Sequence, residues 1–315
     1  MTERADISEI MPDVGHLVDG ATLDDKIAQA HWLVDMAIHR FVTMKDKELV
    51  GRVVLFSGGN DSTILAHLMR ERATHFAHCN TGIGIEQTRQ FVRDVSAHWG
   101  IPLIEKHPGA GNTFRDLVLD QGFPGPAHHW KMYQRLKERG LRQVRGELVK
   151  RGRSERVLFL AGRRRAESSR RTSRQIPEME QQGSVVWVSP LVHWTTADMK
   201  AYRERFDVPR NEVSDMIHMS GECLCGAFAG KGELDEIGFF FPEVRDEIQA
   251  LEAEVAATGL HPPQRCRWGW GADPVARAEA IAKAAGQGQL DLSGPLCSSC
   301  DARFETAFPS TDRST

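Results

Sequence analysis

Residues 51–69, GRVVLFSGGNDSTILAHLM, constrain the fold of this chain more than any other stretch. Apolar residues run into two glycines and four small polar residues, and an apolar pattern with helical spacing follows. This order predicts a buried strand, a tight loop and a helix. Glycines at such a junction let the backbone approach a ligand closely and adopt positive φ. N–H groups at a helix start, together with the helix dipole, favour an anion. The stretch therefore predicts a phosphate-binding loop.

The polar residues of this loop suit the same ligand. Ser57, Ser62 and Thr63 supply hydroxyl donors, whereas Asp61 caps the helix or holds Mg²⁺ against the phosphates. The loop is not of the GxxxxGK[ST] type, because no lysine follows the glycines.

The alternation of apolar strands and amphipathic helices continues along the chain. Further strands are expected at 74–80, 101–107, 156–162 and 184–191. Helices are expected at 22–45, 85–100, 112–156, 195–208 and 243–256. Strand–helix alternation of this kind predicts an α/β fold with a parallel, doubly wound sheet.

Four segments resemble known families. SGGNDS at 57–62 resembles the SGGxDS pyrophosphate loop of the adenine-nucleotide alpha hydrolase superfamily, whose members bind ATP or a derivative. Residues 78–103 are similar to the segment after the second strand in the phosphoadenosine phosphosulfate (PAPS) reductase family. Residues 161–171 fit its GxRxxESxxR pattern, and residues 189–211 resemble its PLxxWxxxDVxxY segment.

The resemblance implies a Rossmann-like nucleotide-binding domain and a set of site residues. Asp61, Arg164 and Arg171 are implied as catalytic: Asp61 would hold Mg²⁺, and the two arginines would bind phosphate or sulfate. The implied nucleotide-binding residues are Ser57, Gly58, Gly59, Asn60, Ser62, Thr63, Asn80, Thr81, Gly82, Glu167 and Ser168.

The chain departs from the assimilatory reductases of that family at two places. The ECGxH-like segment that carries their nucleophilic cysteine is absent from the sequence. Lys131 and Met132 stand where the iron-sulfur subgroup carries a Cys-Cys pair. Both departures argue against direct reduction of sulfate to sulfite.

The six cysteines suggest a metal centre rather than a set of disulfides. Cys79 lies in an expected strand and is predicted to be a buried small apolar residue. The other five form the pattern C-x-C…C…C-x₂-C and are Cys223, Cys225, Cys266, Cys297 and Cys300. Four thiolates suffice for zinc or a [4Fe-4S] cluster, so one of the five is spare.

The spacing does not decide between iron-sulfur and zinc. The pattern resembles the cysteine set of DNA phosphorothioation sulfur-transfer proteins, and this resemblance implies a [4Fe-4S] cluster. Zn²⁺ is the alternative. Trp268 and Trp270, which follow Cys266, stack on a base or pack over the metal module.

Charge is unevenly distributed. Residues 131–175 hold 16 Lys or Arg against 4 Glu, a balance of +12, whereas the rest of the chain carries 24 basic and 39 acidic residues, or −15. The basic region is either a solvated helix face or a surface that meets phosphate or sulfate groups, including those of a nucleic acid. No apolar run is long enough to span a bilayer and no secretory signal is evident, so a cytoplasmic protein is expected.

The expected domains are an N-terminal arm (1–20), a nucleotide-binding α/β domain (21–215), a cysteine-rich module (216–302) and a tail (303–315). The leading hypothesis is an ATP pyrophosphatase that adenylates a substrate for sulfur transfer, with a sulfur-donor protein such as a cysteine desulfurase as partner. The alternatives are a PAPS or adenylyl-sulfate (APS) reductase and a nucleotide-binding module without turnover. The sequence sets no oligomeric state.

Overall fold

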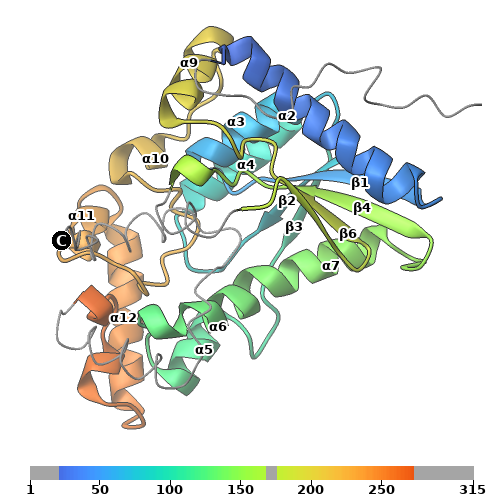
Figure 1. The fold of residues 1–315 in the computed structure, drawn as a ribbon. Coiled ribbons are helices and arrows are strands. Elements are labelled where there is room, and N and C mark those ends of the chain that lie inside the picture. Colours follow the sequence, from blue (N-terminus) through green and yellow to red (C-terminus); the bar gives the residue numbers. More distant parts are fainter. Residues whose placement is uncertain (1–20, 168–175, 273–315) are drawn as a thin grey trace, which may run out of the picture. The chain divides into compact units, whose positions relative to one another are not determined.

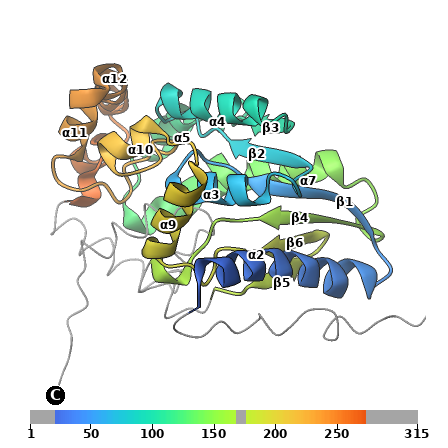
Figure 2. The same ribbon diagram turned by 90° about the horizontal axis from the view of Figure 1, so that it is seen from above.

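The computed structural model describes residues 21–167 and 176–272. These residues include a six-stranded sheet with the strand order β3-β2-β1-β4-β6-β5 (Figures 1 and 2). The strands are β1 (Glu48–Leu55), β2 (His75–Cys79), β3 (Leu103–Lys106), β4 (Glu155–Leu160), β5 (Met179–Gln182) and β6 (Val185–Val188). β4 is parallel to both β1 and β6, with Val54 opposite Leu160 and Leu160 opposite Val188. The predicted α/β fold with a mainly parallel sheet is confirmed.

One strand differs from the sequence prediction. β5 pairs antiparallel with β6 at the edge of the sheet, and Gly183 between them has φ 62°. Its sequence, MEQQ, lacks the apolar alternation that marks a half-buried strand. The sheet is therefore mixed, with an antiparallel edge strand added to a parallel core.

The chain divides into two compact units, and the first contains residues 21–55, 61–76 and 145–209. Its helices include α2 (Leu23–Ile38), most of α3 (Asn60–Met69) and α9 (Thr196–Phe206). Helix α2 packs against α9 and β6 (Figures 1 and 2). Its buried positions Ala30, Leu33, Val34 and Ala37 follow the predicted helical spacing. The helix expected over 22–45 changes to a π-helical turn at His39–Thr43.

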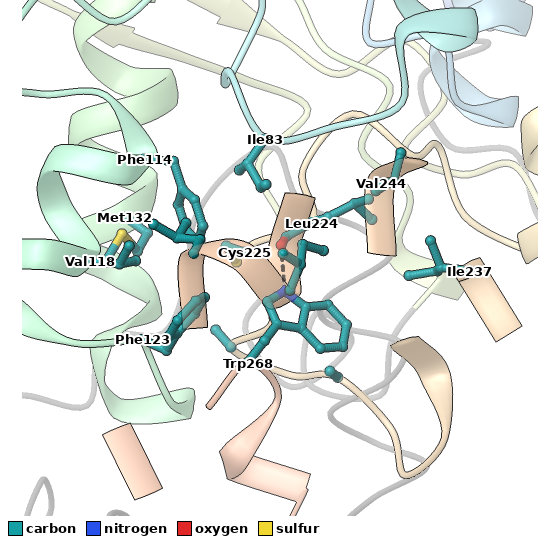
Figure 3. Packing of buried hydrophobic residues seen from close by; sticks show 14 of the residues in the cluster. Ile83, Phe114, Val118, Phe123, Met132, Leu224, Cys225, Ile237, Val244 and Trp268 are labelled. Atoms are coloured by element: carbon teal, nitrogen blue, oxygen red, sulfur yellow. Dashed lines mark hydrogen bonds between the residues drawn. The ribbon is translucent and has the colours of Figure 1, made fainter. Parts of the chain in front are cut away.

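The second unit contains residues 56–60, 77–144 and those from 210 onward. Its helices are α4 (Glu86–His98), α5 (Phe114–Gln121), α6 (His129–Tyr133), the first part of α7 (Arg139–Leu148), α10 (Glu212–Ile217), α11 (Glu233–Phe240) and α12 (Pro242–Ala257). A hydrophobic cluster joins side chains of α5, α6 and α12 with Leu224, Cys225 and Trp268 (Figure 3). Residues between 213 and 268 thus share one core with residues between 83 and 136.

Candidate nucleotide-binding site

The loop that the sequence predicts to bind phosphate lies between β1 and α3. Gly58 has φ 76°, a left-handed conformation that favours glycine. A Cβ on Gly58 would lie 2.9 Å from the Thr88 methyl group, and one on Gly59 would lie 3.1 Å from Ser220 Cβ. Helix α3 begins at Asn60, so its first turn follows the glycines directly and includes Asp61, Ser62 and Thr63. Gly58 is therefore required by both conformation and close packing, whereas a side chain at Gly59 would crowd Ser220.

Asp61 and Arg164 form a tight ion pair within the first unit. Arg164 Nε donates to Asp61 Oδ2 at 2.7 Å, and a second guanidinium nitrogen lies 3.3 Å from Oδ1. The side chains are only 8% exposed for Arg164 and 16% for Asp61. Arg164 also donates to the carbonyl oxygen of Trp194 at 3.5 Å. The structure thus brings together the predicted metal-holding carboxylate and a predicted phosphate-binding arginine.

Sheet topology explains why these two residues meet. The chain passes from β1 through α3 to β2 on one side of β1, whereas β4 lies on its other side. Asp61 follows the carboxyl end of β1, and Arg164 follows that of β4. Gly162 packs against the backbone of Asp61, where a Cβ would lie 3.3 Å from its carbonyl carbon. Ligands of open α/β sheets bind at such a switch point, beyond the carboxyl ends of the strands.

Residues 80–82, predicted to bind the nucleotide, follow β2 in the second unit. Asn80 is 4% exposed; its amide donates to Glu105 at 3.0 Å and its side-chain oxygen accepts from the N–H of Gly82. Thr81 is fully buried and its hydroxyl donates to the Glu222 carbonyl at 2.6 Å. The side chains of Asn80 and Thr81 therefore shape this loop from within, whereas Gly82 is exposed.

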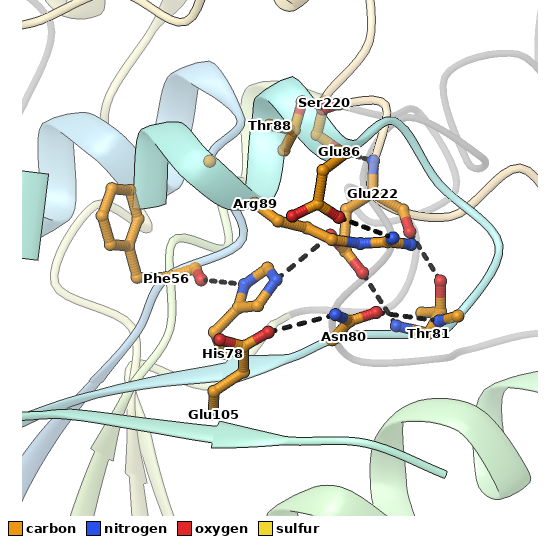
Figure 4. Close-up of polar contacts among 12 residues, drawn as sticks. Phe56, His78, Asn80, Thr81, Glu86, Thr88, Arg89, Glu105, Ser220 and Glu222 are labelled. Carbon is orange, nitrogen blue, oxygen red and sulfur yellow. Dashed lines mark hydrogen bonds and ion pairs between the residues drawn. The ribbon is translucent and has the colours of Figure 1, made fainter. Parts of the chain in front are cut away.

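A buried polar network that the sequence reasoning missed surrounds Glu222 (Figure 4). His78 Nε2 lies 3.1 Å from Glu222 Oε2, and both side chains are 1% exposed. The Phe56 carbonyl oxygen accepts from His78 Nδ1 at 2.8 Å. Burial opposes the charged imidazole, but the Glu222 carboxylate and these hydrogen bonds outweigh it and raise the pKa of His78. No local pattern in the sequence marks this network, because its members are far apart along the chain.

The predicted metal ligands are only partly within the described residues. Cys225 is 2% exposed and belongs to the hydrophobic cluster of the second unit, and Cys223 and Cys266 pack against that cluster. Within residues 21–167 and 176–272, no three His, Cys, Asp or Glu side chains are grouped as a metal site. Cys297 and Cys300 lie outside the described residues, as do Ser168 and Arg171. Glu167 ends a short 3-10 turn, Arg165–Glu167.

Cys79 differs from the other cysteines. Its Sγ lies against α7, where a Cβ on Gly140 would come within 2.9 Å of it. Burial raises the pKa of the Cys79 thiol to about 12. The thiol thus packs inward as expected of a small apolar side chain, although Cys79 as a whole is only partly buried.

The two tryptophans after Cys266 are engaged in packing within the second unit. Trp268 Nε1 donates to the Leu224 carbonyl at 2.7 Å, and Trp270 Nε1 donates to the Phe123 carbonyl at 2.8 Å. Gly226 leaves no room for a Cβ against Trp268, nor does Gly125 against Trp270. These contacts support the packing interpretation over base stacking.

Four residues of the basic region form an exposed stripe, here called the basic stripe, on one helical segment. Lys131, Arg135, Arg139 and Arg142 follow each other at intervals of three or four residues from α6 to α7, and all four are exposed. Arg142 pairs with Glu138 at 2.6 Å, and Arg135 donates to Asn112 at 3.1 Å. Among the residues that the structure describes, no helix is both long and apolar enough to cross a membrane.

The glycine loop follows the carboxyl end of β1, and within the first unit the Asp61–Arg164 pair lies beyond the carboxyl ends of β1 and β4. An arrangement of this kind is typical of nucleotide-binding α/β domains. The model of the phosphoadenosine phosphosulfate reductase domain matches residues 51–218. The chain belongs to this family.

Individual relatives are distant. An uncharacterized protein of Methanocaldococcus jannaschii, MJ0066, is 25% identical over 209 residues, which are 65% of this chain and 42% of that protein. The chain thus spans less than half the length of this relative. Adenosine 5'-phosphosulfate reductase 2 of Bacillus subtilis is 24% identical over 53% of this chain and 68% of its own length. The solved phosphoadenylyl-sulfate reductase of Candida auris is 18% identical with a TM-score of 0.43, covering 64% of this chain and 93% of that one.

Proposed function

We propose that the chain is an ATP pyrophosphatase that adenylates an acceptor for sulfur transfer. The observation that most supports this is the Asp61–Arg164 pair at the carboxyl ends of β1 and β4, beside the glycine loop in the chain. Metal-bound ATP needs a cationic group and a carboxylate. The cation binds the phosphate oxygens, and the carboxylate supplies an oxygen ligand to the metal. Carboxylate and hydroxyl oxygens suit Mg²⁺.

In the proposed first step, the phosphates of ATP lie on the loop residues 57–62. An acceptor oxygen attacks the α-phosphorus, the bond from that phosphorus to the bridging oxygen breaks, and pyrophosphate leaves. Arg164, joined by Arg171, stabilises the charge that develops on the departing phosphates. Asp61 is the residue that would hold Mg²⁺, which neutralises phosphate charge when it is bound. Gly82, Glu167 and Ser168 are further proposed nucleotide-binding residues.

In the proposed second step, a sulfur nucleophile replaces the adenylated oxygen and AMP leaves. Thiolates fit an iron-sulfur cluster or zinc, so four of the five predicted cysteines would hold a [4Fe-4S] cluster or Zn²⁺. That centre would bind or deliver the sulfur. A protein of the cysteine desulfurase class is the proposed donor of persulfide sulfur, and two electrons from a thiol reductant would bring that sulfur to the sulfide level. A nucleic acid or nucleotide that meets the basic stripe is the proposed acceptor.

The first test is calorimetry on the full chain, purified without oxygen, with Mg-ATP, PAPS and APS as ligands. Binding requires no acceptor, so a missing second substrate cannot conceal it. We expect the chain to bind Mg-ATP tightly and to bind neither PAPS nor APS. Preference for PAPS or APS would instead favour a reductase, the activity named for the Bacillus subtilis relative.

A substitution tests the role of the carboxylate. Asp61→Asn keeps the size of the side chain and can still accept a hydrogen bond from Arg164. We expect at least a hundredfold loss of pyrophosphate release with an unchanged circular dichroism spectrum. Undiminished turnover would exclude Asp61 as the metal-holding residue.

A further inference from the structure

Within the second unit, the segment that carries Cys223 and Cys225 is fixed through every other residue. Glu222, Leu224 and Gly226 each have a defined partner, and the two cysteines lie between them.

Glu222 is fixed on both its side chain and its backbone. Its Oε1 accepts the N–H of Thr81 at 2.8 Å, and its Oε2 lies 3.1 Å from His78 Nε2 (Figure 4). Its carbonyl oxygen accepts the Thr81 hydroxyl at 2.6 Å. A carboxylate that is 1% exposed is strongly destabilised without such partners, so it has one favourable position.

Backbone hydrogen bonds continue this attachment on either side. Ile85 N–H donates to the Gly221 carbonyl, and Leu224 N–H donates to the Ile83 carbonyl, both at 2.8 Å. A Cβ on Gly84 would lie 2.5 Å from the Glu222 carbonyl oxygen. Only glycine allows this approach, so the loop after β2 is shaped to receive the cysteine segment.

The other end of the segment is held by an indole. Trp268 Nε1 donates to the Leu224 carbonyl at 2.7 Å (Figure 3). The Trp268 backbone N–H donates to Glu252 on α12 at 2.6 Å. Its ring also lies against Gly226, where a Cβ would come within 2.7 Å of the indole nitrogen. The carbonyl between the two cysteines is therefore tied to the residue two positions after Cys266.

We propose that His78, Thr81 and Trp268 are positioning residues that fix the Cys223–Cys225 thiol pair before any metal or sulfur species binds. This inference rests on the proposed sulfur-transfer function. The three residues do not touch the reacting atoms. They act by holding Glu222 and Leu224, which limits the directions that the adjacent thiols can take.

The test compares conservative variants of the full chain. Trp268→Phe removes the indole donor to Leu224, and Glu222→Gln weakens the pair with His78. Trp270→Phe is the matched control, because it removes an equivalent indole donor to the Phe123 carbonyl. One readout is the rate of alkylation of each cysteine, resolved by peptide mass spectrometry. The other is the iron bound per chain after reconstitution with ferrous iron and sulfide.

We expect Trp268→Phe and Glu222→Gln to raise alkylation of Cys225 at least tenfold and to reduce bound iron at least threefold. Trp270→Phe should remain within twofold of the unsubstituted chain in both readouts. Unchanged alkylation in both variants would overturn the proposal, and so would faster alkylation with undiminished iron. If the unsubstituted chain binds no iron, the proposed metal centre fails, but the alkylation rates still decide whether these residues hold the segment.

Discussion

Gly58 and Gly82 allow the conformational and steric requirements of glycine to be separated. Both have φ 76°, but a Cβ would meet Thr88 at Gly58 and nothing within 4 Å at Gly82. Gly82→Ala should therefore cost only the left-handed strain, about 1 kcal/mol of unfolding free energy. Gly58→Ala should cost about 3 kcal/mol, because overpacking adds to this strain. Urea denaturation measures both, and equal losses would contradict the steric argument.

The Asp61–Arg164 pair contributes to stability as well as to the proposed chemistry. Arg164→Leu leaves a largely buried carboxylate without its cation, which should cost about 3 kcal/mol. Arg205→Leu, which breaks the exposed pair with Asp24, should cost under about 1 kcal/mol. The double variant Asp61→Asn/Arg164→Leu should lose less stability than the sum of the two single variants, because it leaves no buried charge unpaired. Additive losses in thermal denaturation would show that the two side chains are not coupled.

His67 predicts a pH dependence of stability. Burial, aided by the nearby Arg70 guanidinium, lowers the pKa of His67 to about 4. The unfolded chain therefore binds more protons than the folded chain between about pH 4 and 6.5, so this residue makes stability rise with pH across that window. His67→Asn, which cannot take up this proton, should flatten the dependence by at most about 3 kcal/mol. Identical slopes in urea titrations at several pH values would contradict this assignment.

Within the described part of the chain, three helices begin with the same capping box, and the box on α9 also joins two helices. Thr22–Asp25 on α2, Thr113–Asp116 on α5 and Thr195–Asp198 on α9 each have reciprocal side-chain and backbone bonds. Asp198 additionally pairs with Lys26 of α2.

Because of this second contact, Asp198→Ala should cost more than removal of a cap alone. We expect about 2 kcal/mol, against about 1 kcal/mol for Asp116→Ala on α5. In a chain that also carries Lys26→Met, Asp198→Ala should cost about as much as Asp116→Ala. Thermal unfolding of these variants and of the unsubstituted chain is the measurement. Equal losses for the two aspartates in the unsubstituted background would exclude a contribution from the pair.

Elements with a clear apolar period were predictable from the sequence, and the others were not. α2, α4 and the buried strands β1 and β4 follow from apolar spacing and capping residues. β5 has a polar sequence and forms only because β6 offers it an edge. α10 and α11 lie in a segment where cysteines, glycines and prolines obscure the helical period.

The site shows the same division. The residues of the loop and Arg164 were identifiable, because their spacing along the chain carries the pattern. The Glu222 network was not, since Thr81 and Glu222 are 141 positions apart and neither residue is unusual alone. Such contacts depend on tertiary packing and have no local signature.

The charge of the whole chain also leads to a prediction. A balance of +12 over residues 131–175 against −15 elsewhere should orient a polyanion toward the basic stripe. Arg135→Glu/Arg139→Glu should weaken binding of a DNA or RNA duplex at least tenfold and reduce the salt dependence of the affinity. Lys200→Glu/Lys231→Glu, with the same change in net charge at other exposed sites, is the control. Equal losses for both pairs in fluorescence anisotropy would indicate a general charge effect.

The interleaving of the two units has a consequence for synthesis on the ribosome. The second unit uses residues 56–60, 77–144 and those from 210 onward, whereas the first is finished at residue 209. Proteins generally begin to fold from the N-terminus as they emerge. While residues 77–209 emerge, Leu224 and Trp268 have not yet been synthesised. Ile83, Phe114 and Phe123 therefore lack these partners in their hydrophobic cluster. The nascent chain therefore exposes apolar surface for most of its translation, which makes it a natural client for chaperones that act at the ribosome.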